Sequence, residues 1–175
     1  MNKYLYAITF VSEDRPGIVA QVTKVLYERG FNIKDSSSTL LQRIFSMILL
    51  VEHMENFLPE EIKSFFSLDL APSVHVLANI SEKTSMPTNR YVISVYGADK
   101  PGIVHTITEQ LCHMGVNIVD LQTQTTGTPP NNTYIMILEV LVPAALKTDW
   151  MAVLKQAAES IKTDITVRKL ETYEL

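Results

Sequence analysis

The chain contains two copies of one sequence pattern, 85 positions apart. Asp-Arg-Pro-Gly-Ile-Val at 14–19 returns as Asp-Lys-Pro-Gly-Ile-Val at 99–104, and Gly-Phe-Asn-Ile at 30–33 returns as Gly-Val-Asn-Ile at 115–118. Across positions 6–35, 13 residues are identical to their counterparts at this offset, without a gap. A repeat of this length predicts two domains of the same fold, and it limits the chain to architectures that one half can complete alone.

We expect domain 1 at 1–82, a linker at 83–88 and domain 2 at 89–175. Both halves are slightly acidic, and the formal net charge of the whole chain is −4, which argues against direct binding to nucleic acid. The single cysteine excludes an internal disulfide and a CxxC metal or redox pair. Because no apolar run approaches the length of a membrane span, we expect a cytoplasmic protein without a membrane partner.

Both halves show the same order of strand and helix patterns. Alternating apolar residues predict strands, apolar residues at helical spacing predict helices, and Gly30 is placed to end the first helix in a left-handed conformation. The order is βαββαβ, which predicts an α+β fold of two ferredoxin-like domains in tandem, each with helices on one face of an antiparallel sheet. The expected strands are 4–11, 32–41, 44–52, 74–80, 91–96, 117–125, 133–141 and 165–170, and the expected helices begin near 16, 59, 101 and 148 and end near 29, 70, 114 and 161.

The expected strands carry apolar residues on both faces. In the first strand Tyr6, Ile8 and Phe10 share one side, while Leu5 and Val11 lie on the other. A sheet with two apolar faces predicts that a second copy or another protein covers the face opposite the helices, as in a homodimer. The alternative is a partly exposed sheet with scattered apolar side chains.

The repeated motif has a chemical interpretation and a structural one. A helix that begins after Pro16 presents unsatisfied N–H groups, which bind a carboxylate or phosphate. Gly17 allows a ligand or another backbone segment to approach closely. Asp14 could hold an ammonium group, together with Asn32 if that residue lies beside this turn. The helix start and these two side chains together suit a free α-amino acid. Alternatively, Asp14 caps the helix, Pro16 starts it, Gly17 and Gly30 serve packing and capping, and Asn32 and Asn117 are turn residues.

The paired motifs resemble the ACT domain family and, within it, the glycine cleavage system transcriptional repressor group most of all. The resemblance covers nearly the entire chain twice and implies a regulatory module that binds amino acids or other small effectors, usually at interfaces between domains. It also implies control of amino-acid metabolism, with a transcription factor as a protein partner. By resemblance the ligand-binding residues are Ser12, Glu13, Asp14, Arg15, Pro16, Gly17, Ile18, Asn32, Ile33, Asp99, Lys100, Pro101, Gly102, Ile103, Asn117 and Ile118.

The chain departs from the serine-binding members of that family in the loop of each copy. Those members carry a histidine two positions before an asparagine of the loop. This chain has Asp14 and Asp99 in place of that asparagine, and Ser12 and Gly97 in place of the histidine. Serine specificity is therefore not supported. Since Gly97 supplies no side chain, the second site is expected to bind differently or not at all.

No catalytic, cofactor or metal motif stands out. The four histidines lack zinc-ligand spacing, there is no glycine-rich phosphate loop, and Cys112 fits a packing position in a helix. We therefore expect a non-enzymatic protein without a cofactor. The alternative function is a protein-interaction or oligomerisation module whose ligand sites are vestigial.

Overall fold

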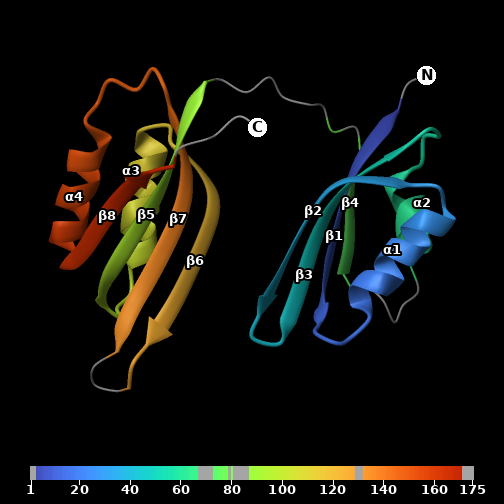
Figure 1. Ribbon diagram of the computed structural model, residues 1–175, viewed down its shortest axis with the longest axis horizontal. Helices are drawn as coiled ribbons and strands as arrows, with labels where there is room; N and C mark the ends of the chain where they lie inside the picture. Colours follow the sequence, from blue (N-terminus) through green and yellow to red (C-terminus); the bar gives the residue numbers. More distant parts are fainter. Residues whose placement is uncertain (1–2, 67–72, 79, 81–86, 129–131, 171–175) are drawn as a thin grey trace. The chain divides into compact units, whose positions relative to one another are not determined.

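The computed structural model describes residues 3–66, 73–78, 80, 87–128 and 132–170, and the chain forms two compact units, 1–83 and 84–175 (Figure 1). Most of the expected linker, 83–88, lies outside the described residues, and the strand that opens unit 2 begins at Thr88. The domain bounds given above remain a prediction.

Each unit is a four-stranded antiparallel sheet with two helices, which confirms the expected βαββαβ fold. The strand order is β2-β3-β1-β4 in unit 1 and β6-β7-β5-β8 in unit 2. The elements of unit 1 are β1 (Tyr4–Glu13), α1 (Ile18–Glu28), β2 (Asn32–Leu41), β3 (Ile44–His53), α2 (Pro59–Ser64) and β4 (Ser73–Ala78). Those of unit 2 are β5 (Thr88–Ala98), α3 (Ile103–His113), β6 (Asn117–Thr126), β7 (Thr133–Pro143), α4 (Trp150–Ser160) and β8 (Thr163–Lys169).

Helix α2 is shorter than the sequence pattern predicts. It ends at Ser64, whereas a helix to about Leu70 was expected; residues 67–70 lie outside the described part of the chain. The chain turns at Phe65, and Phe66 packs edge-on against Phe10 at 4.8 Å between ring centroids. Burial of this aromatic ring in the core therefore takes precedence over another helical turn.

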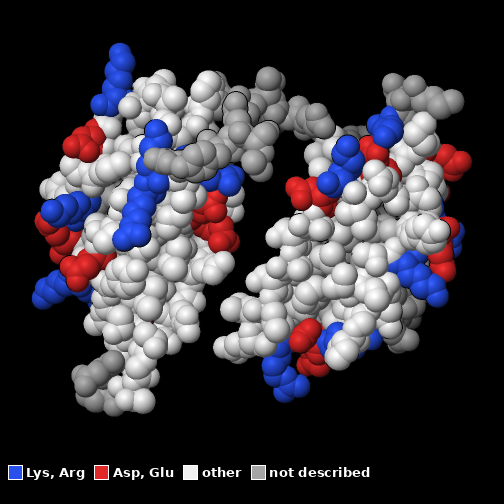
Figure 2. Space-filling model, in the orientation of Figure 1, with Lys and Arg blue, Asp and Glu red and all other residues white. Residues whose placement is uncertain are grey.

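Charged side chains of both signs are interspersed on the surface. On the face drawn in Figure 2, Lys and Arg alternate with Asp and Glu around broad uncharged areas, without one dominant basic patch. None of the helices among the described residues has the length and apolar character that a membrane crossing requires.

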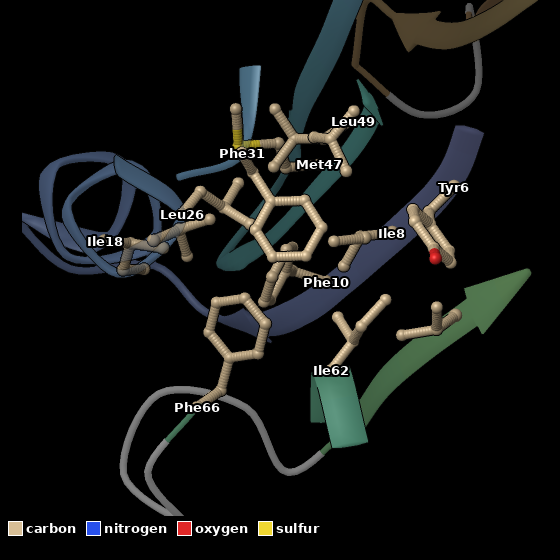
Figure 3. Packing of buried hydrophobic residues seen from close by; sticks show 13 residues of the cluster. Tyr6, Ile8, Phe10, Ile18, Leu26, Phe31, Met47, Leu49, Ile62 and Phe66 are labelled. Carbon is tan, nitrogen blue, oxygen red and sulfur yellow. The ribbon is translucent and has the colours of Figure 1, made fainter. Parts of the chain in front are cut away.

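The core of unit 1 lies between the sheet and its helices (Figure 3). Alternate residues of β1, namely Tyr6, Ile8 and Phe10, are almost fully buried, as the alternation predicts. They meet the buried side of α1 and the alternate residues of β3, and together these side chains form the core: Ile18, Val22, Leu26, Met47, Leu49 and Val51. Unit 2 repeats this arrangement, with Trp150 of α4 packed edge-on against Tyr91 at 5.0 Å between centroids.

The opposite face of each sheet also carries apolar residues, as expected. In unit 1 Ile48 of β3 is 53% exposed and Leu77 of β4 is 66% exposed. In unit 2 the counterpart of Ile48 is Ile137, which is exposed to a smaller degree, and the counterpart of Leu77 is Arg168. What covers these faces remains a prediction.

Candidate functional site

The turn between β1 and α1 differs from the expected one. The residue that caps α1 is Gly17, at φ 92° and ψ −4°, so Asp14 is not the cap and Pro16 lies outside the helix. Gly102 repeats this geometry before α3, at φ 97°. A Cβ on Gly17 would meet nothing within 4 Å. The glycine is therefore required by its left-handed backbone and not by a close approach of another group.

This turn leaves the first N–H groups of α1 without a side-chain acceptor in the described part of the chain. The first helical bond runs from the N–H of Gln21 to the carbonyl oxygen of Gly17, at 2.9 Å, so the N–H groups of Ile18, Val19 and Ala20 precede the helical ladder. Helix α4 provides the contrast, because its cap Asp149 accepts a hydrogen bond from the N–H of Ala152 at 3.2 Å. The starts of α1 and α3 thus lack the side-chain acceptor that α4 has.

A hollow of about 440 Å³ lies at this helix start. The hollow is lined by Asp14, Arg15, Gly17, Ile18, Val19, Ala20 and Phe45. The N–H of Asp14 donates to the carbonyl oxygen of Arg43 at 2.8 Å, which fixes the loop to the β2–β3 hairpin, and Arg15 donates to Gln21 Oε1 at 2.9 Å. Among the described residues, no partner is found for the Asp14 carboxylate. The hollow therefore offers a carboxylate beside uncapped N–H groups.

Ser12 lies next to this hollow and carries a buried hydroxyl without a partner. It is opposite Phe45 in the β1–β3 register, on the same side of the strand as Phe10. Its Oγ is inaccessible to solvent and has no hydrogen-bond partner within the described chain. Because a buried polar group that stays unpaired is costly, this hydroxyl is an unsatisfied group at the strand end before the loop.

Asn32 and Ile33 do not lie beside the loop, contrary to the expectation. Asn32 pairs with Glu52, which is opposite Leu5 at the beginning of β1, whereas the loop follows Glu13 at the end of that strand. At about 3.3 Å per strand residue, the two places are about 25 Å apart. Asn32 and Ile33 line a separate hollow of about 570 Å³ beside the outer side of α1.

Asn32 belongs to a polar cluster of its own. Its Nδ2 donates to Glu52 Oε1 at 3.0 Å, and the Lys3 ammonium donates to the same oxygen at 2.6 Å. Lys34 lies 4.0 Å from the other carboxylate oxygen. The hydrogen bond from Lys3 first, and then that from Asn32, lowers the pKa of Glu52 below its usual value of 4.5. The duplicated asparagine therefore has a structural role in unit 1.

The second copy of the loop has the same backbone but different side-chain contacts. Asp99 lies where Asp14 does, and its carboxylate accepts a hydrogen bond from Thr125 Oγ1 at 3.3 Å. Lys100, Pro101, Gly102 and Ile103 complete this loop and the start of α3. Asn117 and Ile118 again lie at the far end of the sheet, where Asn117 is opposite Leu141 instead of a carboxylate.

Sequence reasoning missed three residues of the hollow in unit 1. Val19 and Ala20 were treated only as helix positions, although residues in the first turn of an uncapped helix present their N–H groups. Phe45 begins the third strand, and only the pairing register brings it beside Ser12. Within the described residues, no group of three or more His, Cys, Asp or Glu side chains could hold a metal ion.

Both units match family models of the same kind. Residues 6–56 match a model described as the ACT domain, and residues 89–167 match a second model with the same description.

Among curated proteins, UPF0237 proteins of Methanococcus maripaludis and Methanosarcina mazei are similar to part of this chain. They are 51% identical over 45 residues and 45% identical over 58 residues, which is 26% and 33% of this chain. The chain spans only 50% and 63% of the length of these relatives.

Two solved structures match almost the whole chain. An unknown protein from Galdieria sulphuraria has a TM-score of 0.82 and 25% identity, and the match covers 97% of this chain and 100% of that one. A structure named for a glycine cleavage system transcriptional repressor has a TM-score of 0.70 and 17% identity, over 98% and 100% of the two chains. The second likeness is one of fold alone.

Proposed function

The chain belongs to the ACT domain family, with one such domain in each unit, and from this premise we propose that it is a non-enzymatic regulatory protein that binds an amino acid or a similar small effector. The binding place that we propose is the β1–α1 loop with the first turn of α1.

The observation that carries this proposal is the uncapped start of α1 beside the Asp14 carboxylate, which has no partner among the residues that the structure describes. The N–H groups of Ile18, Val19 and Ala20, at the positive end of the helix dipole, suit the carboxylate of an amino acid. Asp14 lines the same hollow and suits its ammonium group.

A regulator must also convert binding into a signal. A bound effector shifts the balance between two states only by its difference in affinity for them. We propose that the signal is a contact with another protein, such as a transcription factor, and that it controls amino-acid metabolism. The negative net charge and the interspersed surface charges support a protein contact over direct DNA binding (Figure 2).

Thermal unfolding of the full chain against each of the twenty common amino acids at millimolar concentration tests the proposal. A ligand present at a hundred times its dissociation constant adds about 2.7 kcal/mol, which raises the midpoint by roughly 5–10 °C. We expect one or a few amino acids to do so in the natural chain and none in Asp14→Ala. Glu28→Gln, at the other end of α1, is the matched control and should keep the response. If no amino acid moves the midpoint, the proposal is refuted.

A second function is favoured by the apolar sheet faces. Exposed Ile48 and Leu77 in unit 1 support a module whose working surface is the open sheet and whose loop no longer binds ligand. Ile48→Lys should then abolish self-association in light scattering after size exclusion, while Asp14→Ala leaves it unchanged. A natural chain that is monomeric would remove the homo-oligomeric form of this function.

A further inference from the structure

We infer that the effector binds to unit 1 only, one molecule per chain. In unit 2 the Thr163 methyl group fills the space beside the loop, and the Asp99 carboxylate already accepts a hydrogen bond. The inference rests on the proposed function and concerns which of the two duplicated loops performs it.

The first difference lies at the strand end before each loop. Gly97 is the counterpart of Ser12 at the 85-residue offset, and it pairs with Thr163 at the start of β8. A Cβ at Gly97 would lie 2.6 Å from Thr163 Cγ2. Thr163 is buried, and its Oγ1 donates to the carbonyl oxygen of Ala158 at 3.1 Å, so the side chain is fixed in place. Unit 1 has a hydroxyl at this position without a partner in the described chain, whereas in unit 2 the Thr163 methyl group leaves no room for a side chain.

The second difference concerns the aspartate of the motif. Asp99 accepts a hydrogen bond from Thr125, which holds its carboxylate toward β6. The counterpart of Thr125 in unit 1 is Leu40, which is exposed and cannot donate. The Asp14 carboxylate, which has no partner in the described chain, is the one left to a ligand ammonium.

The third difference is in the first turns of the two helices. Ala20 lines the hollow in unit 1, and its counterpart in unit 2 is the bulkier His105. The Nε2 of His105 lies 3.8 Å from Glu109 Oε2, one helical turn further on. The counterpart of Glu109 in unit 1 is Lys24. A ligand carboxylate at α3 would therefore meet a larger side chain than at α1 and, one turn further on, the negative Glu109 in place of the positive Lys24.

Amide chemical shifts of the ¹⁵N-labelled full chain test the inference, with a millimolar mixture of the twenty common L-amino acids as the probe. We expect the amides of Ile18, Val19 and Ala20 to shift in the natural chain. In Asp14→Asn no amide should shift, including those of 103–105, and the matched variant Asp99→Asn should respond like the natural chain.

The outcomes separate this inference from the proposed function. If the amides of 103–105 still shift in Asp14→Asn, or if Asp99→Asn abolishes the shifts at 18–20, unit 2 takes part in binding and the inference is overturned, while the regulatory function stands. Calorimetry with the active amino acid alone should give one molecule per chain, and a ratio of two overturns the inference in the same way. If no amide moves in any of the three proteins, the proposed function fails and the inference fails with it.

Discussion

The contact between Gly97 and Thr163 allows a quantitative test of the packing that distinguishes the two units. Gly97→Ala places a Cβ at 2.6 Å from Thr163 Cγ2, 3.3 Å from its Cβ and 3.5 Å from the carbonyl oxygen of Lys162. Only the first of these contacts is a severe clash. Thr163→Ser removes that methyl group and keeps the hydroxyl that bonds to Ala158, so the second substitution should relieve the first.

The magnitudes follow from packing. Forcing an extra methyl group into a filled site costs about 1–3 kcal/mol, and the lower entropy of the unfolded chain offsets about 0.4–1 kcal/mol of this for Gly→Ala. Because the clash at 2.6 Å is severe, the packing cost belongs in the upper half of that range, about 2–3 kcal/mol, and Gly97→Ala should lose about 1–2.6 kcal/mol net. Thr163→Ser alone should lose about 0.8 kcal/mol for its buried methyl group. In the double variant the new methyl group occupies the vacated space, so the loss should be below about 1 kcal/mol instead of the sum of the two.

Trp150 makes this measurement specific to unit 2. It is the only tryptophan of the chain and is packed in the same core as the β5 strand that carries Gly97. Urea unfolding followed by tryptophan fluorescence should show a midpoint lowered by on the order of 1 M for Gly97→Ala and largely restored in the double variant. A Gly97→Ala protein as stable as the natural chain, or losses that simply add in the double variant, would refute the reasoning.

Three further changes have defined outcomes. Asp149→Ala removes the only side-chain cap among the described starts of α1, α3 and α4 and should cost about 1 kcal/mol by tryptophan fluorescence; an unchanged midpoint would contradict the capping role. Tyr6→Phe removes the oxygen that accepts from the N–H of Phe57 at 2.8 Å, and a loss of about 1–2 kcal/mol is expected in urea unfolding followed by circular dichroism. Lys3→Ala should raise the pKa of Glu52 toward 4.5, as measured by carboxyl titration in NMR. Since the folded pKa lies below the unfolded one, Glu52 stabilises the fold above about pH 4.5 and loses this contribution as the pH falls through the folded value, so the variant should lose less stability on acidification.

The duplicated pattern was sufficient to predict the fold. Alternation in β1 and helical spacing in α1 each identify a buried face, and the register of β1 with β3 joins these faces into one core. The end of α2 was not predictable in this way, because Phe65 and Phe66 suit a helix locally. Their actual positions depend on aromatic rings from distant segments, among them Phe10 and Phe31.

The conformation of the motif glycines was only half predicted. The left-handed residue after α1, Gly30 at φ 78°, follows from the common way in which helices end. Gly17 was interpreted as a residue that permits close approach, since glycine before a helix has several uses and its dihedral angles are not visible in a sequence. Because Gly17 is the cap, the Asp14 carboxylate does not accept a hydrogen bond from the first turn of α1, and in the proposed site it is available to a ligand.

The position of Asn32 could have been deduced from the element order alone. In a βαβ unit the helix carries the chain back along the sheet, so the strand after the helix starts at the same end as the strand before it. The two halves of the motif are therefore close in sequence only because α1 spans the distance between them. In unit 1 Asn32 bonds to Glu52, while the counterpart of that carboxylate beside Asn117 is Leu141. In the site that we propose for unit 1, the ligand ammonium is therefore left to Asp14, because the Asn32 amide of the same unit lies about 25 Å away.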